Sequence, residues 1–319
     1  MDSQELKEKF GTPEQCLDYI TKLRFPYGVC CENRKCEKYI NPNLKKEYKL
    51  TDYKFKCFYC KSQISATSYS IFEGTPRRLL PLWFKAIWYV TSERSGTSAL
   101  ELQKVLELGT YRTAWTWLQE LRSVMMKNQE KLQGTVIIDK FEIIVNKDSY
   151  SENEYTVLIA LEFNKKKFGQ IRMIEIKYDD SDKIDEADKI ADFIKYNVKP
   201  LESTLFSYKG YSAIDFSKLS ETDYPLKLVK KKGKNFEPIC KVISYLEKKE
   251  LLNTLACAGS RKNLSSYLKE CCFKFNKRKN KDNWFYDLLD NTVYPPRSPK
   301  EAAIQKEMEE AEEAEYPSV

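Results

Sequence analysis

Apolar residues near the start of the chain recur first at helical spacing and then at the spacing of short strands. Thr12 and Pro13 supply an N-cap and a first-turn proline, and apolar residues follow at helical spacing: Cys16, Leu17, Ile20 and Leu23. This pattern predicts a helix that ends before Phe25. Further along, aromatic residues stand at intervals that suit short strands: Tyr48, Tyr53 and Phe55.

The helical period returns from Leu79 to about Gln129 and predicts three helices. Their inward residues are expected to be Leu82, Trp83, Ala86, Ile87 and Val90; then Leu102, Val105 and Leu106; then Ala114, Trp115, Leu118, Leu121 and Val124. A turn at Leu108-Gly109-Thr110 would join the last two, which gives the outline of a helix-turn-helix. A purely structural helical hairpin has the same outline. If the third helix reads DNA, its outward residues there are Tyr111, Arg112, Thr113, Thr116 and Gln119.

A period of two follows and predicts a sheet. Residues 134–146, 154–163 and 170–178 read as strands, followed by an amphipathic helix and a short strand near residues 203–207. The helix would turn these residues inward: Ile184, Ala187, Ile190, Ala191, Ile194 and Tyr196. Three strands, a helix and a strand suit an α/β layer with a mixed sheet, and the RNase H-like arrangement begins in this way.

A Lys-rich segment at residues 227–234 (KLVKKKGK) reads as a loop, either a solvated one or a nuclear-localisation or phosphate-contact run. The chain is then expected to be helical to about Lys279, with a polar, frayed helix after Pro295-Pro296. The fold class expected is therefore α/β in a multidomain (α+β) chain. Its segments are an N-terminal helix and cysteine-rich ribbon (1–75), a helix-turn-helix (76–130), the mixed-sheet domain (131–290) and an acidic tail (291–319).

Cysteine spacing indicates a metal site. The chain has 10 Cys and no His, and four Cys form two pairs on either side of a β-like stretch: Cys31, Cys36, Cys57 and Cys60. Two such turns form a zinc ribbon, in which four thiolates close a tetrahedral structural site. Cys30 competes with Cys31 for the first position, and two clusters of reduced buried cysteines are the alternative. The other cysteines, Cys240, Cys257, Cys271 and Cys272, lack ligand spacing and read as small buried apolar residues.

Composition narrows the classes of function. Without His, the Ser-His-Asp and Cys-His nucleophile arrangements are excluded. The net charge is +7, but residues 301–319 carry seven acids and one base, a net of −6, so residues 1–300 carry about +13. A basic body suggests a polyanion partner, most simply nucleic acid, while a solvated Lys-rich surface is the alternative. The lack of a membrane span or secretory segment favours an intracellular protein, cytoplasmic or nuclear according to the host.

Several stretches, in order, resemble the Merlin-type DDE transposases and the related bacterial insertion-sequence transposases. They are RFPYGVCC…CFYC, SIFEGTPRRLLPLWFKAIWYV, SGTSALELQKVLELGTYRTAWTWLQELRSVM, GTVIIDKFEI and YLKECCFKFNKRKN, and together they cover roughly residues 14–280. In that family a zinc ribbon and a helix-turn-helix recognise the ends of the element. An RNase H-like core then cuts and joins DNA with two divalent metals held by acidic residues.

The resemblance also implies a damaged catalytic site. The first family Asp matches Asp139, whose usual acidic neighbour is Lys140 here, and the last acid matches Glu237 weakly. The second matches Phe206, which cannot bind a metal, and Asp215 is the candidate replacement. We therefore expect a transposase-derived protein that binds double-stranded DNA, has structural zinc and has lost strand transfer.

Two alternatives stay open. One is an active transposase that uses Mg²⁺ with Asp139, Glu237 and an unrecognised second acid. The other is a protein-interaction scaffold whose acidic tail binds a protein partner. A homodimer is compatible with each of these, and no membrane partner is expected.

Overall fold

The computed structural model describes residues 1–25, 35–36, 49–51, 53–68, 70–93, 96–127, 129–145, 153–164, 167–176, 186–209, 214–230, 241–242, 244–246 and 263–293. The chain divides into two compact units. Unit 1 comprises Met1–Ser92, Leu102–Lys127 and Asp282–Val319, and unit 2 comprises Glu93–Glu101 and Asn128–Lys281. The chain therefore leaves unit 1, builds unit 2 and returns, a grouping that differs from the four consecutive segments expected from the sequence.

Helices build most of unit 1. They are α1 (Ser3–Phe10), α2 (Pro13–Arg24), the 3-10 turn η1 (Arg77–Leu79), α4 (Leu80–Ser92), α6 (Tyr111–Val124), the 3-10 turn η3 (Lys281–Asn283) at its boundary and α11 (Trp284–Val293), while α5 (Ala99–Leu106) spans the boundary between the units. Helix α4 packs against α1, α2 and α11. Aromatic rings fill the contact, since the ring of Phe10 lies 4.8 Å from that of Phe84 and 5.7 Å from that of Phe285. Neither α1 nor α11 was predicted from the sequence.

The start of α2 confirms the predicted cap. The Thr12 hydroxyl accepts a hydrogen bond from the Gln15 N–H at 3.3 Å, and the Gln15 side chain accepts one from the Thr12 N–H at 3.0 Å. This reciprocal capping box satisfies two helix-terminal donors that otherwise lack partners. Pro13 occupies the first turn, where its missing N–H costs no helical hydrogen bond.

A small antiparallel sheet follows α2 in unit 1. Its strands are β1 (Lys49–Thr51), β2 (Lys54–Lys56) and β3 (Gln63–Ser65), in the order β1-β2-β3. Phe55 and Ile64 pair across β2 and β3 and are both buried. The Arg24 guanidinium at the end of α2 donates to the Ala66 carbonyl at 3.3 Å, which ties the sheet to the helix.

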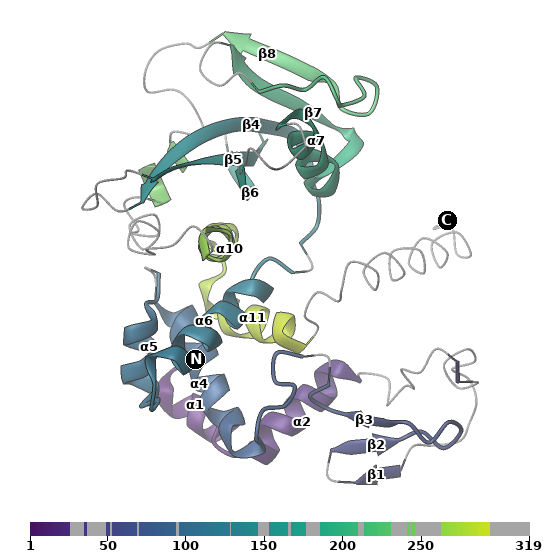
Figure 1. Cartoon of the computed structure of the whole chain (residues 1–319), viewed down its shortest axis with the longest axis vertical. Helices are drawn as coiled ribbons and strands as arrows, with labels where there is room; N and C mark the ends of the chain where they lie inside the picture. Colours follow the sequence, from purple (N-terminus) through teal and green to yellow (C-terminus); the bar gives the residue numbers. More distant parts are fainter. Residues whose placement is uncertain are drawn as a thin grey trace. The chain divides into compact units, whose positions relative to one another are not determined.

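Unit 2 contains a mixed five-stranded sheet (Figure 1). Its elements are β4 (Leu132–Val145), β5 (Asn153–Asn164), β6 (Lys167–Ile176), α7 (Glu186–Asn197), β7 (Val198–Lys209), β8 (Leu226–Lys230) and α10 (Leu264–Asn276). The strand order is β6-β5-β4-β7-β8, in which β4, β5 and β6 are antiparallel neighbours while β7 runs parallel to β4 and β8 parallel to β7. The expected α/β class and mixed sheet are confirmed.

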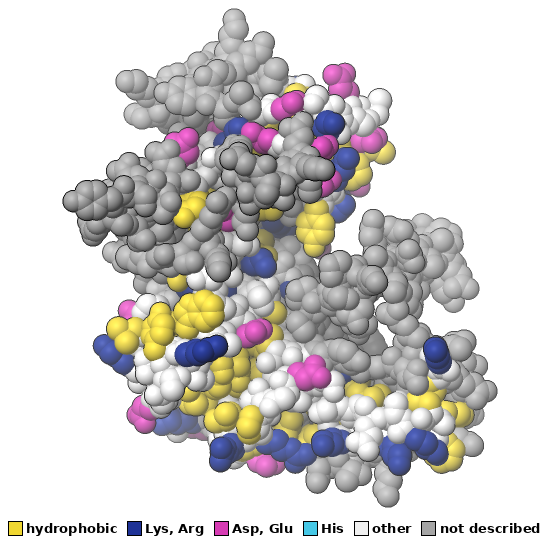
Figure 2. Space-filling model, viewed as in Figure 1, with side chains coloured by type: hydrophobic (Ala, Val, Ile, Leu, Met, Phe, Trp, Pro, Cys, Tyr) yellow, Lys and Arg dark blue, Asp and Glu magenta, His cyan; other side chains and the backbone are white. Residues whose placement is uncertain are grey.

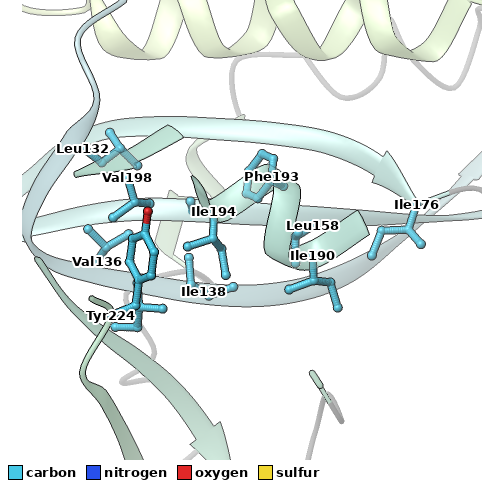
Figure 3. Close-up of a cluster of buried hydrophobic side chains, with 12 residues drawn as sticks. Leu132, Val136, Ile138, Leu158, Ile176, Ile190, Phe193, Ile194, Val198 and Tyr224 are labelled. Carbon is cyan, nitrogen blue, oxygen red and sulfur yellow. The ribbon is translucent and has the colours of Figure 1, made fainter. Parts of the chain in front are cut away.

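One face of the sheet packs against α7. Figure 3 shows Ile190, Phe193 and Ile194 of this helix among the apolar side chains of the strands. Val136 and Ile138 of β4 point into the same cluster, and both are completely buried. Because side chains alternate along a strand, the odd-numbered residues of this part of β4 belong to the opposite face.

Two details of unit 2 differ from the sequence predictions. Tyr196 was expected to face inward but is 80% exposed, and Phe193 is buried in its place. The segment predicted as a Lys-rich loop begins inside strand β8, because Leu226 and Lys227 pair with Leu205 and Phe206 of β7. Residues 231–240 lie outside the described residues. Among the helices that the structure describes, none is long and apolar enough to cross a membrane.

Candidate metal centre and nucleic-acid interface

Three cysteines meet beside the small sheet. The sulfur atoms of Cys36, Cys57 and Cys60 all lie within 4.8 Å of one another, and Cys36 Sγ is 3.6 Å from Cys57 Sγ. Cys36 and Cys57 are buried, and Cys60 is half-buried with its Sγ 2.9 Å from Ser62 Oγ. Such a group could hold a metal ion.

A tight turn between β2 and β3 places two of these thiols. The Cys57 carbonyl accepts a hydrogen bond from the Lys61 N–H at 3.0 Å, and the Cys57 N–H donates to the Ser62 carbonyl at 2.9 Å. Lys61 adopts a left-handed backbone conformation, with φ of 61°, which closes the turn. The backbone thus directs Cys57 and Cys60 toward one point.

The spacing of the sulfurs fits tetrahedral metal coordination better than a disulfide. A disulfide bond is about 2.05 Å long. Four thiolates about 2.3 Å from a zinc ion lie about 3.8 Å apart at the corners of a tetrahedron. The separation of 3.6 Å between Cys36 and Cys57 is close to that edge. The predicted fourth ligand, Cys31, and its competitor Cys30 lie outside the described residues.

Other thiols behave differently. Cys16 and Cys272 lie in apolar surroundings, where burial raises the pKa of each thiol to about 12. Both thiols therefore stay protonated at neutral pH, and a protonated thiol is a poor metal ligand. Cys271 and Cys272 are only 2% and 1% exposed, which confirms them as small buried residues.

The turn between α5 and α6 is sharply defined. The Leu108 N–H donates to the Gln103 carbonyl at 3.0 Å and the Glu107 N–H to the Lys104 carbonyl at 3.3 Å, which is a Schellman motif. Glu107 is its left-handed residue, with φ of 54°. Gly109 was expected to provide this turn, but the positive φ falls two residues earlier. Thr110 then caps α6 by accepting from the Thr113 N–H.

The first turns of α6 present part of the predicted DNA-reading set. Tyr111 is 54% exposed, and Arg112 and Thr116 are exposed as well. Thr113 is half-buried, with its hydroxyl 2.9 Å from that of Thr110. Gln119 does not belong to this set, because both of its amide atoms are buried without a hydrogen-bond partner in the described residues.

The buried side of α6 also differs in one residue. Trp117, not Trp115, is the buried tryptophan, and its ring stacks on that of Trp83 with centroids 4.0 Å apart. Position 117 is three residues from Ala114 and four from Leu121, so it continues the same helical stripe. Figure 2 shows Lys and Arg side chains along the surface of unit 1, and the exposed lysines there include Lys22, Lys54, Lys56 and Lys61.

Asp139 and Phe206 lie on neighbouring strands. Ile137 of β4 pairs with Phe206 of β7 in parallel register, and Asp139 lies two residues beyond Ile137 on the same face. Asp139 is 9% exposed, and its carboxylate accepts the Lys140 N–H at 2.8 Å. Glu237 lies outside the described residues.

Asp215 has a local role in the loop after β7. It is exposed, and its carboxylate accepts the Ser217 N–H at 2.9 Å. That hydrogen bond lowers the pKa of the carboxyl group and makes an Asx turn. In the described residues, the one group of three cysteines or carboxylates with all donor atoms within 4.8 Å is the cysteine group above.

No family model and no curated protein matches this chain. The interpretation of its sites therefore depends on the geometry of its own residues.

Two functional candidates were not found from the sequence. Lys140 forms an ion pair with Glu186 at the start of α7, with Nζ 2.7 Å from Oε1. Lys227 of β8 places its ammonium 5.7 Å from the centre of the Phe206 ring. Both contacts join residues 20 or more positions apart, so only the strand register and the helix packing reveal them.

Proposed function

We propose that this chain is a DNA-binding protein in which a zinc ribbon and a helix-turn-helix contact duplex DNA and strand transfer has been lost. The observation that carries the proposal is the exposed start of α6. A capped helix that follows a tight turn and presents Tyr111, Arg112 and Thr116 fits the major groove, where such residues can reach base edges.

The cysteine group supports the zinc part of the proposal. Thiolates are soft ligands, and the chain has no His that could form a mixed site. Zinc would be held by Cys36, Cys57 and Cys60 with a fourth cysteine, for which Cys31 is the candidate. In this role zinc supplies structural cross-linking of a sheet whose strands are only three residues long.

The loss of catalysis is supported by the strand register. The transposase resemblance implies a second carboxylate at the position of Phe206, and Phe206 lies on the same sheet face as Asp139. A two-metal mechanism needs oxygen ligands from both strands to hold cations about 4 Å apart. An apolar ring at that position offers no ligand. The mixed sheet itself agrees with the RNase H-like core that the resemblance implies.

The test of DNA binding is Arg112→Ala in the full chain. If Arg112 contacts a base, the substitution should weaken binding to a selected duplex by about 1–3 kcal/mol, roughly 5- to 150-fold. Lys195→Ala removes one positive charge from an exposed position in α7 and serves as the control. Fluorescence anisotropy with duplexes enriched from a random pool measures both. Equal losses for the two variants would leave only a general charge effect and contradict the proposal.

A further inference from the structure

Lys227 lies where ligands commonly bind to α/β sheets. Strands β4, β7 and β8 run parallel, so their carboxyl ends meet along one edge of the sheet. The neighbour of β4 on its other side, β5, is antiparallel, so the connectivity changes direction at β4. Ligands of open α/β sheets bind beyond the carboxyl ends of strands near such a change.

The register sets Phe206 and Lys227 side by side. They are paired residues of parallel strands β7 and β8, so both side chains project from the face that also carries Asp139. The Lys227 ammonium lies 5.7 Å from the Phe206 ring centre, within the range of a cation–π contact. Phe206 is half-buried and Lys227 is exposed, which leaves the ammonium open to solvent.

The charge of Lys227 is not neutralised by a carboxylate. Lys140, Lys199 and Lys218 of the same unit each have an acidic partner, at 2.7, 3.6 and 3.7 Å. Within the described part of the chain, no carboxylate oxygen lies within 4.0 Å of the Lys227 ammonium. A ring quadrupole orients a cation without removing its charge, so Lys227 is held in place and still able to bind an anion.

More lysines occur where β7 and β8 end. Lys209 and Lys230 are paired positions at the ends of the two strands, three residues beyond Phe206 and Lys227. Along the sequence, Lys231, Lys232 and Lys234 follow. Close positive charges raise the local concentration of anions, and a phosphate chain can contact several of them at once.

We infer that the β7–β8 edge is a metal-independent binding site for the phosphates of a nucleic-acid strand, with Lys227 as its fixed contact. The inference rests on the proposed function, and it extends nucleic-acid binding from α6 in unit 1 to the sheet of unit 2. A divalent metal in such a position neutralises phosphate charge. The ammonium of Lys227 provides positive charge here directly, and the Phe206 ring positions it.

The test uses Lys227→Gln in the full chain and a single-stranded oligonucleotide in buffer with EDTA. A single strand offers phosphates but no duplex groove. The slope of log K against log salt concentration should fall by about 0.7, because one phosphate contact is lost. At 0.1 M salt this corresponds to roughly fivefold weaker binding, since 10 to the power 0.7 is about 5. Phe206→Leu, which keeps an apolar side chain but removes the ring, should give a smaller loss.

The matched control is Lys167→Gln, which removes an exposed lysine from β6 at the other edge of the same sheet. It should leave the slope unchanged. If Lys227→Gln leaves affinity and slope at the values of the unmodified chain, or Lys167→Gln lowers them equally, the inference is wrong, whatever Arg112→Ala does to duplex binding. If Lys227→Gln weakens single-strand binding while Arg112→Ala has no effect on duplex binding, the inference stands and the proposed role of α6 fails.

Discussion

Glu107 occupies the position of a Schellman motif that glycine fills most often. Its φ of 54° places it in the left-handed region, where a β-carbon crowds the backbone. Its carboxylate also lies at the carboxyl end of α5, where the helix dipole disfavours negative charge. The turn before α6 therefore stores unfavourable energy in one exposed residue.

Glu107→Gly should stabilise the protein. Glycine relieves the steric cost and removes the charge, and these gains exceed the extra entropy of glycine in the unfolded chain by about 0.5–1 kcal/mol. Urea unfolding followed by circular dichroism measures the change. Glu107→Ala is the control, because it removes the charge but keeps the β-carbon. A gain for alanine as large as that for glycine would show that the strain is absent.

Single residues also show how far the sequence could be used to predict the site. Cysteine spacing was sufficient for Cys36, Cys57 and Cys60, because few other arrangements use paired cysteines in a chain without His. Gln119 could not be placed correctly, since its burial depends on what packs over α6 and not on its spacing. The contact of Lys227 with Phe206 depends on strand register, which the apolar pattern does not determine.

The small sheet cannot be stabilised by its own core. Its three strands have three residues each, and Phe55 and Ile64 are their buried apolar residues among those whose burial the structure describes. Sheets of this size usually depend on metal or on packing against another element. Here Arg24 supplies the packing and the cysteine group is the candidate for the metal.

Removal of metal should therefore unfold this sheet selectively. In Cys57→Ser, or after chelation, backbone amides of β2 and β3 should exchange hydrogen at nearly unprotected rates, while those of β4 and β5 keep their protection. Hydrogen-exchange mass spectrometry measures both regions in one sample. Cys272→Ser is the control, because that thiol is buried away from the cysteine group. Protected β2 and β3 amides in metal-free protein would contradict a structural role for the metal.

Elements with strong local signals were predicted well. Thr12-Pro13 marked the start of α2, and alternation of Val, Ile and Phe marked β4 and β5. Helix α1 was missed because Leu6 and Phe10 are its buried residues, too few to make a periodic pattern. Strand β8 was read as a loop because its lysines hide a short alternation that the pairing with β7 makes clear.

Unit 1 is completed by a helix from the far end of the described chain. Helix α11 packs against α2, α4 and α6, and its buried residues are Trp284, Phe285, Leu288, Leu289, Asn291, Thr292 and Val293. The Thr292 carbonyl accepts the Ile71 N–H at 3.2 Å. The stability of the N-terminal helices thus depends on residues that follow the whole of unit 2.

A chain that ends at Lys281 should lose the fold of unit 1 while unit 2 remains folded. Burial of Trp284, Phe285, Leu288 and Leu289 contributes about 1.5–3 kcal/mol each, together about 6–12 kcal/mol, which is comparable to the stability of a whole domain. Limited proteolysis with mass spectrometry should show cleavage in α2 and α4 and protection of β4 to β7. A chain that ends at Val293 is the control and should resist cleavage. Equal resistance of both chains would show that α11 is dispensable.

The return of the chain to unit 1 has a consequence for synthesis on the ribosome. At about 5–20 residues per second, the interval between the emergence of α4 and that of α11 is roughly 10–40 s. During this time Phe10 and Phe84 lack the ring of Phe285 that completes their packing. The sheet of unit 2, with all of its strands between residues 132 and 230, can form first. The amino-terminal helices are therefore made first and completed last, and for that interval they are natural clients for chaperones that bind exposed aromatic segments.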